Sequence, residues 1–399
     1  MTPRRWVLLS AVSCLLSPAW GQLFPPEQMA RIQQGLRDVY NLEHARAIEN
    51  YQGMIRAAPD DPAGYAYLAF TYWVQELSGK QELSIDRFAS SDFFSEAPQY
   101  MLRVDSAAEA RFRQASEQAI EKARARLLRQ PQDRTARFLL GLAYQNLASF
   151  EASLKRSWWA AFRNGSKTYR YHQELLRQDP NFHEARLATG VYQYVAGSLG
   201  WSAKWLALLL GYRGSRTRGK QELETAVRKA TLVADDARII LTLIYTRERN
   251  YQRAFDYLNE LLRRYPQNYL VHLDMGGMAL LMKRPEAAIT IYEDILRRRE
   301  AGQAKYAELE AAYVHNRLGV AHRYHKDLRA SGEWFRRALA EPQASGRSKT
   351  IARLELGKTL DLDGRRQEAL EHYTAVAAAE DIAGTQAEAR ELQGRPFVR

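Results

Sequence analysis

The sequence repeats a spacing of small and large side chains with a period of 34 residues. Ala254 and Ala288 lie one full period apart, and each is followed four residues later by a large side chain, Leu258 and Tyr292. A period of this length indicates a solenoid, in which each unit buries its hydrophobic face against its neighbours. Gly and Pro contribute only 23 and 13 of the 399 residues, too few for a turn-rich all-β chain. We therefore expect stacked helical hairpins.

Each unit resembles a tetratricopeptide repeat (TPR). A small residue on the first helix and an Ala on the second let the two helices approach closely, aromatic side chains fill the space between hairpins, and Pro ends the unit. The positions that carry the resemblance are Ala47, Tyr51, Pro59, Leu68, Tyr72, Leu140, Gly141, Tyr144, Tyr245, Ala254, Leu258, Pro266, Gly276, Ala288, Tyr292, Leu318, Gly319, Phe335, Ala338, Leu356, Gly357, Ala369 and Tyr373. The resemblance implies an all-α, TPR-like helical-hairpin solenoid (superhelix) with extended or inserted helices.

The repeat register divides the chain into segments, and three units contain more residues than the period allows. Extra residues in a solenoid map to lengthened helices or to loops on one face, often the working face. The expected segments are a signal peptide at 1–21, N-terminal TPR-like units with inserts at 22–182, a unit with an apolar Gly-bounded insert at 183–234, two regular units at 235–302, C-terminal units at 303–381, and a polar tail at 382–399.

The first 21 residues have the layout of a secretory signal peptide. Two arginines without an acid precede the apolar run 6–16, and Ala19 and Gly21 supply small residues for cleavage before Gln22. A lipoprotein signal with Cys14 as the lipidated residue is one alternative, and an uncleaved anchor is another. The first two interpretations predict an exported protein that is periplasmic or associated with the cell envelope.

The insert at 190–219 resembles a stretch of the tetratricopeptide-repeat-39 and fungal inclusion-body clearance proteins. The resemblance rests on the residues Gly190, Tyr192, Tyr194, Gly197, Ser198, Leu199, Gly200, Trp201, Lys204, Trp205, Leu206, Leu209, Leu210, Gly211, Tyr212, Arg213, Gly214 and Gly219. It implies a non-catalytic helical scaffold associated with membrane or lipid-linked quality control.

Three residues of this insert have a pattern of their own. Trp201, Lys204 and Trp205 flank an apolar stretch, as interfacial aromatic rings and a snorkelling Lys do at a membrane surface. The stretch is too short to span a bilayer. We therefore predict these three residues as membrane or lipid contacts, and the alternative is a lengthened hairpin buried within the solenoid.

The register also predicts a protein-binding groove. In a TPR superhelix, the first helix of each unit lines the concave side, and its groove-facing positions offer amide, guanidinium and phenol groups. Such groups suit an extended or helical segment of an acidic partner. The predicted groove residues are Gln145, Asn146, Tyr194, Arg247, Asn316, Arg323 and Tyr324.

The sequence contains only weak matches to nucleotide-binding and metal-binding motifs. The segment 214–221 has the spacing of a phosphate loop, but Gln221 stands where Ser or Thr would hold Mg²⁺. His315, His322 and His325 could share a helix face, yet no carboxylate lies at a metal-ligand spacing. We expect no enzyme, no cofactor, no metal and no nucleotide.

The chain is basic, with a formal net charge of +12. Its arginines recur near the end of each unit's second helix, where they oppose the helix dipole, so nucleic acid is not an expected partner. The sequence predicts a non-enzymatic TPR scaffold for protein–protein interaction in the bacterial cell envelope. We expect a protein or peptide partner of acidic character and a membrane-surface contact. The alternative is a lipid- or small-molecule-binding helical repeat module that uses the apolar insert at 195–212.

Overall fold

The structure is a computed structural model that describes residues 23–79, 104–198, 214–382 and 384–398. Within these ranges the regular elements are 18 α-helices and one short 3-10 helix. The elements are α1 (Pro26–Tyr40), α2 (His44–Ala57), α3 (Pro62–Gly79), α5 (Ser106–Arg129), α6 (Arg134–Ser153), α7 (Trp158–Gln178), η2 (His183–Ala185), α8 (Arg186–Ser198), α10 (Arg216–Lys229), α11 (Ala234–Arg247), α12 (Tyr251–Arg264), α13 (Tyr269–Leu281), α14 (Pro285–Glu300), α15 (Ala304–Ala307), α16 (Ala311–Tyr324), α17 (Leu328–Ala340), α18 (Gly346–Leu362), α19 (Arg366–Ala377) and α20 (Thr385–Gly394).

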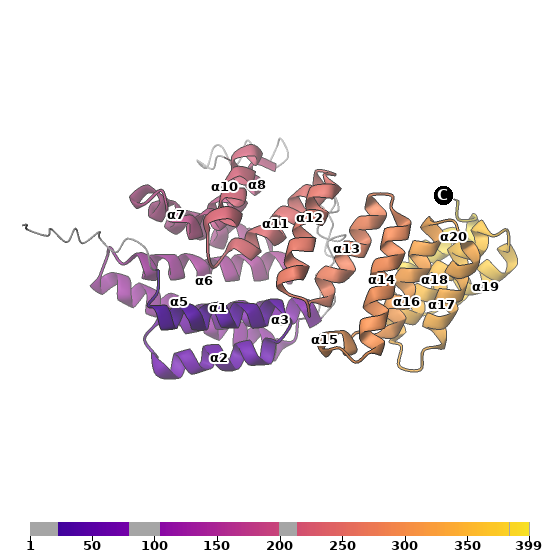
Figure 1. The fold of residues 1–399 in the computed structure, drawn as a ribbon, viewed down its shortest axis with the longest axis horizontal. Coiled ribbons are helices and arrows are strands. Elements are labelled where there is room, and N and C mark those ends of the chain that lie inside the picture. Colours follow the sequence, from indigo (N-terminus) through magenta and orange to yellow (C-terminus); the bar gives the residue numbers. More distant parts are fainter. Residues whose placement is uncertain (1–22, 80–103, 199–213, 383, 399) are drawn as a thin grey trace, which may run out of the picture.

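Consecutive helices pair as hairpins, and the hairpins stack into a TPR-like superhelix (Figure 1). The predicted fold class is therefore confirmed. The regular units α11 to α14 have helices of 13 to 16 residues, whereas α5, α6 and α7 have 24, 20 and 21. The predicted extended helices are thus present in the N-terminal half.

A glycine on the first helix of a hairpin packs against an aromatic ring on the second. A Cβ atom placed on Gly276 would lie 2.3 Å from Cε1 of Tyr292. The same relationship joins Gly319 to Phe335. Only a residue without a side chain permits this approach, which is the steric reason for the small residue in the sequence pattern.

The first hairpin returns to pack against the middle of the solenoid. The side chain of Asn268, which caps α13, donates a hydrogen bond of 2.7 Å to the carbonyl oxygen of Tyr40 at the end of α1. The rings of Tyr40 and Tyr265 lie 5.0 Å apart. One hydrophobic core extends from Phe24 to Met278. The N-terminal units therefore form a closed turn rather than an open row.

The C-terminal segment differs from the expected polar tail. Residues 385–394 form α20, whose Ala389 and Leu392 are buried against the preceding hairpin. The last hairpin of a solenoid would otherwise leave an apolar face uncovered, and a terminal helix with a polar outer face covers it.

The predicted signal peptide at 1–21 lies outside the described residues, as do Trp201, Lys204 and Trp205. Among the described helices, none has both the length and the hydrophobicity needed to cross a membrane.

A cationic pocket between α7, α8 and α10

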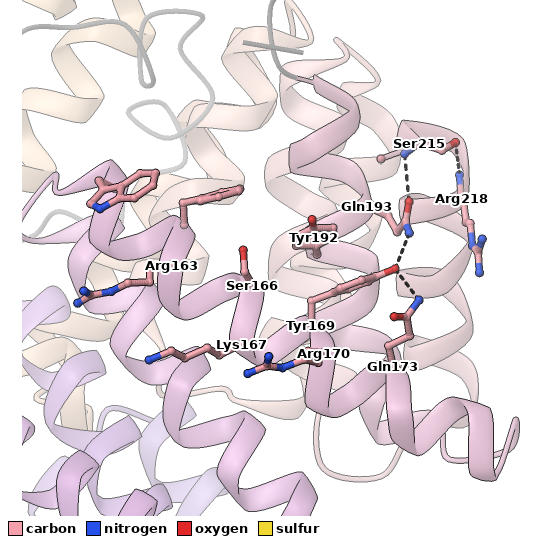
Figure 2. A pocket seen from close by; sticks show the side chains of 13 residues that line it. Arg163, Ser166, Lys167, Tyr169, Arg170, Gln173, Tyr192, Gln193, Ser215 and Arg218 are labelled. Carbon is pink, nitrogen blue, oxygen red and sulfur yellow. Dashed lines mark hydrogen bonds between the residues drawn. The ribbon is translucent and has the colours of Figure 1, made fainter. Parts of the chain in front are cut away.

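One cavity in the described part of the chain lies between α7, α8 and the start of α10, with a volume of about 870 Å³. We call it the α7 pocket, and its lining residues include Trp159, Arg163, Tyr169, Tyr192 and Arg218. Figure 2 shows these side chains around the opening. Among the described residues that line it there is no Asp, Glu, His or Cys.

One face of α7 supplies three cations to this pocket. Arg163, Lys167 and Arg170 recur at helical spacing and all line the cavity (Figure 2). Among the described residues, none of the three has a carboxylate within salt-bridge distance. Burial lowers the pKa of Lys167, and the neighbouring guanidinium groups of Arg163, Arg124 and Arg170 lower it further. Within the described part of the chain, the α7 face is therefore a concentration of positive charge without a paired carboxylate.

Aromatic rings from α7 and α8 form another part of the lining. Tyr169 of α7 and Tyr192 of α8 stack with their centroids 4.0 Å apart. Trp159 is 71% exposed, and its ring lies 6.2 Å from that of Phe162. A large exposed aromatic residue beside a cavity is a candidate anchor for a partner.

Hydrogen bonds fix one wall of the pocket. Gln173 and Gln193 donate to the Tyr169 hydroxyl at 2.9 and 3.1 Å, and the backbone N–H of Ser215 donates to Gln193 at 3.2 Å. The Ser215 hydroxyl accepts the N–H of Arg218 and so caps α10 (Figure 2). The positive end of the α10 dipole is therefore oriented toward this wall.

Glycines bring α8 and α10 into backbone contact beside the pocket. A Cβ on Gly219 would lie 2.7 Å from the carbonyl oxygen of Gly190, and one on Gly214 would lie 2.4 Å from the backbone nitrogen of Gly197. The glycines that bound the insert in the sequence thus have a packing function in the structure. Residues 199–213 between them lie outside the described residues.

The predicted groove residues lie on four different helices, α6, α8, α11 and α16. Asn146 and Asn316 are buried and donate to the carbonyl oxygens of Ala66 at 2.8 Å and Ser348 at 3.0 Å, which belong to neighbouring units. Arg323 is buried against Glu355.

The remaining groove residues differ in exposure. Tyr194 is buried, and its hydroxyl donates to Glu248 at 3.4 Å. Gln145 and Arg247 are half-buried, and Tyr324 is 55% exposed. The side chains with buried intramolecular contacts stabilise the stacking of units, and partner binding by this set stays a prediction.

The three histidines considered as metal ligands have other neighbours. His315 and His322 pack against Trp334 at 5.4 and 6.5 Å, and His325 lies 3.0 Å from Glu286. In the described ranges no group of three possible ligand side chains is arranged to hold a metal ion.

The basic face of α7 was not among the sites predicted from the sequence. A signal for it exists, because no acidic residue occurs between Glu151 and Glu174 while three arginines and two lysines do. This run falls in one of the units with extra residues. Helical spacing would have placed Arg163, Lys167 and Arg170 on one face.

Family models described as tetratricopeptide repeat match residues 206–269 and 245–313. No enzyme family is among these matches, and no curated protein matches the chain. The solved structures that are similar to it include the following three. Yeast Tom70 has 11% identity and a TM-score of 0.38, over 91% of this chain and 87% of Tom70. The human IFIT1 dimer with PPP-AAAA has 13% identity and a TM-score of 0.42, over 93% of this chain and 85% of that one. A tetratricopeptide repeat protein from Parabacteroides merdae ATCC 43184 has 14% identity and a TM-score of 0.31, over 82% of this chain and 99% of that one.

Proposed function

We propose that this chain, a tetratricopeptide repeat protein, is a non-enzymatic scaffold that binds a protein partner in the bacterial cell envelope. Repeats of this kind typically mediate protein–protein interaction, and their stacked units present extended surfaces to a partner. The observation that carries the proposal is the α7 pocket, whose described lining residues combine several cations with an exposed Trp159 and half-buried aromatic rings and include no acid.

The chemistry of the α7 pocket selects an acidic partner segment that also carries an aromatic or large apolar side chain. Guanidinium groups such as Arg163 and Arg170 form paired hydrogen bonds with carboxylates. Trp159 and the stacked pair Tyr169 and Tyr192 offer flat surface for an aromatic side chain. The same positive surface also attracts an acidic segment over distance, which raises the association rate at low salt.

Charge reversal tests this assignment. The double variant Arg163→Glu and Arg170→Glu should weaken binding of a labelled peptide of alternating Glu and Tyr by about tenfold or more, measured by fluorescence anisotropy. The matched control is Arg263→Glu with Arg347→Glu, which changes the net charge equally at two exposed positions away from the pocket. Equal peptide affinity of both double variants would show that net charge, rather than the α7 pocket, determines binding.

The envelope location rests on the N-terminal pattern, namely the arginines and apolar run that precede Ala19 and Gly21. Intact mass spectrometry of the protein from its native host should show a mature chain that begins at Gln22. A mature chain that begins at a lipidated Cys14 would replace the soluble location with an anchored one, and a full-length chain would rule out a cleaved signal peptide.

A lipid- or small-molecule-binding module is the second candidate function. The observation that favours it is that the α7 pocket includes Gly214 and Ser215, at one end of the apolar insert. Native mass spectrometry of the purified protein should then show a retained ligand. The double variant Trp201→Ala with Trp205→Ala should no longer float with anionic vesicles, and its melting temperature should equal that of the wild type. A lowered melting temperature would instead indicate that both rings are packed in the solenoid.

A further inference from the structure

A short extended segment of the chain lies across the first helices of the last two hairpins. After α20 the backbone becomes extended at Arg395, and the segment 395–398 continues past α16 and α18. Within it, Phe397 is half-buried, while Val398 is 77% exposed. The segment 395–398 therefore lies on α16 and α18 as a bound peptide would, although it belongs to the same chain.

Two cations contact the Phe397 ring. The guanidinium carbon of Arg323 lies 5.6 Å from the ring centroid, and the ammonium of Lys358 lies 5.7 Å from it. Arg323 belongs to α16 and Lys358 to α18, so the ring bridges two successive units. Both cations are held by the carboxylate of Glu355, which accepts hydrogen bonds from each. Cations fixed in this way present a pre-organised surface for an aromatic face.

An acidic side chain also holds the backbone of the segment. The N–H of Phe397 donates to Asp361 at 2.8 Å, and the Asp361 side chain is fully buried. Tyr373 and Arg366 donate to the same carboxylate at 2.8 and 3.0 Å. Asp361 is therefore fixed before the segment arrives and offers a remaining acceptor position to a peptide N–H.

We propose that Arg323, Lys358 and Asp361 form a recognition site for an aromatic residue in an extended segment of a partner protein, and that Phe397 occupies this site in cis. The site goes beyond the proposed function, because it lies on the C-terminal hairpins and not at the α7 pocket. Arg323 was predicted as a groove residue, and its guanidinium is covered here by the chain's own Phe397.

The contacts of the segment suit an occupant that a partner can displace. The segment is anchored by one ring and one backbone hydrogen bond, and it is followed by an exposed residue. Ala389 and Leu392 hold α20 through the core, so the terminal helix does not depend on Phe397. A tethered segment acts at an effective concentration of about a millimolar, so a partner that makes additional contacts competes with it.

The test uses the full chain with Phe397→Ala, which empties the site, and Val398→Ala as the matched control. The probe is a labelled peptide with the sequence of residues 392–398, Leu-Gln-Gly-Arg-Pro-Phe-Val. We expect Phe397→Ala to bind this probe at least about tenfold more tightly than the wild type or Val398→Ala. Replacing the probe's Phe by Ala should abolish binding, and replacing it by cyclohexylalanine should weaken it, since the saturated ring lacks the π face.

The other outcomes overturn the proposal. Failure of folded Phe397→Ala to bind the probe would show that the ring is only a packing element, and equal binding to all three proteins would show that the site is not occupied in cis. Should Phe397→Ala be unfolded by circular dichroism, Phe397→Leu keeps the apolar bulk and gives the same comparison. The α7 double variant Arg163→Glu with Arg170→Glu, combined with Phe397→Ala, should bind the probe normally, so the two proposals fail independently.

Discussion

The hydroxyl of Tyr40 donates a hydrogen bond of 2.6 Å to the carboxylate of Asp236, across 196 residues of chain. The bond joins the end of α1 to the start of α11 and so fixes the closed turn of the N-terminal units. Burial raises the pKa of Asp236 to about 7, and the bond from Tyr40 opposes that rise because it stabilises the carboxylate. The closure therefore depends on a polar contact inside the superhelix as well as on apolar packing.

We predict that Tyr40→Phe destabilises the protein by about 1–3 kcal/mol, because it leaves the Asp236 carboxylate without this donor. The loss should be larger at pH 8 than at pH 6, because the carboxyl group becomes neutral as the pH falls below its pKa of about 7. Urea unfolding of the wild type and of Tyr40→Phe at the two pH values measures this loss of stability. Tyr65→Phe, which removes an exposed hydroxyl bonded to the Pro59 carbonyl oxygen, is the control and should cost much less.

The sequence could predict the hairpins because their determinants are local. A glycine such as Gly276 and the ring that covers it, Tyr292, recur at a fixed separation, so spacing alone predicts the contact. The α7 pocket could not be predicted in the same way. It requires α7 to lie beside α8 and the start of α10, and a long insert separates α8 from α10 in the sequence.

The repeat register predicts on which helix a groove residue lies, but it does not predict the contacts of that residue's side chain. The register placed Asn146 and Asn316 on the first helix of their units, and both lie there. It could not show that the neighbouring unit comes close enough for each amide to reach a backbone carbonyl. The tightness of the superhelix depends on many inter-unit contacts, and a single repeat does not encode it.

Gly276→Ala tests the close approach of two helices. Its new Cβ would meet the Tyr292 ring at 2.3 Å, so the ring or the helix must move, and we expect a destabilisation of about 1–3 kcal/mol. Gly165→Ala is the matched control in α7, where a Cβ would meet nothing within 4 Å. It should stabilise the protein by about 0.5–1 kcal/mol through helix propensity. If thermal unfolding showed an equal loss of stability for Gly276→Ala and Gly165→Ala, the steric explanation would be refuted.

Acid should destabilise the protein through His172, which takes the ring position of its hairpin. His172 is buried, stacks on Phe138 at 5.4 Å, and donates to the Phe138 carbonyl oxygen at 3.2 Å. Burial lowers its pKa from 6.5 to about 4. The unfolded chain therefore binds the proton first, and the stability present above pH 6.5 is lost as the pH falls toward 4.

His172→Phe should remove this part of the pH dependence. Between pH 7 and pH 5 the variant should lose about 2 kcal/mol less than the wild type. Phe is tolerated at this position in another unit, where Phe335 packs on Gly319. Denaturant unfolding at the two pH values measures the difference, and parallel losses in both proteins would assign the acid sensitivity to other groups. His172→Tyr gives a second comparison, since Tyr292 occupies the position elsewhere.

The last prediction concerns a helix that is capped by a neighbouring hairpin. Helix α11 has Val233 at its N-cap position, which offers no side-chain acceptor. The carboxylate of Glu184 instead accepts the backbone N–H groups of Thr231 at 2.7 Å and of Leu232 and Val233 at 3.2 Å. Burial raises the pKa of Glu184, and these three hydrogen bonds oppose that rise. Glu184 therefore supplies acceptors to the turn that begins α11.

Glu184→Ala should destabilise the protein by about 2–3 kcal/mol, because the N–H groups of two buried residues, Leu232 and Val233, lose their acceptor. Hydrogen exchange should localise the effect, with faster exchange of these two amides than in the wild type. Glu184→Gln retains one acceptor oxygen, so its stability should lie between that of the wild type and that of Glu184→Ala. The control Glu174→Ala removes a more exposed carboxylate that contacts Gln178 and Arg177 within α7. Unchanged exchange at Leu232 and Val233 in Glu184→Ala would show that the start of α11 is held by packing alone.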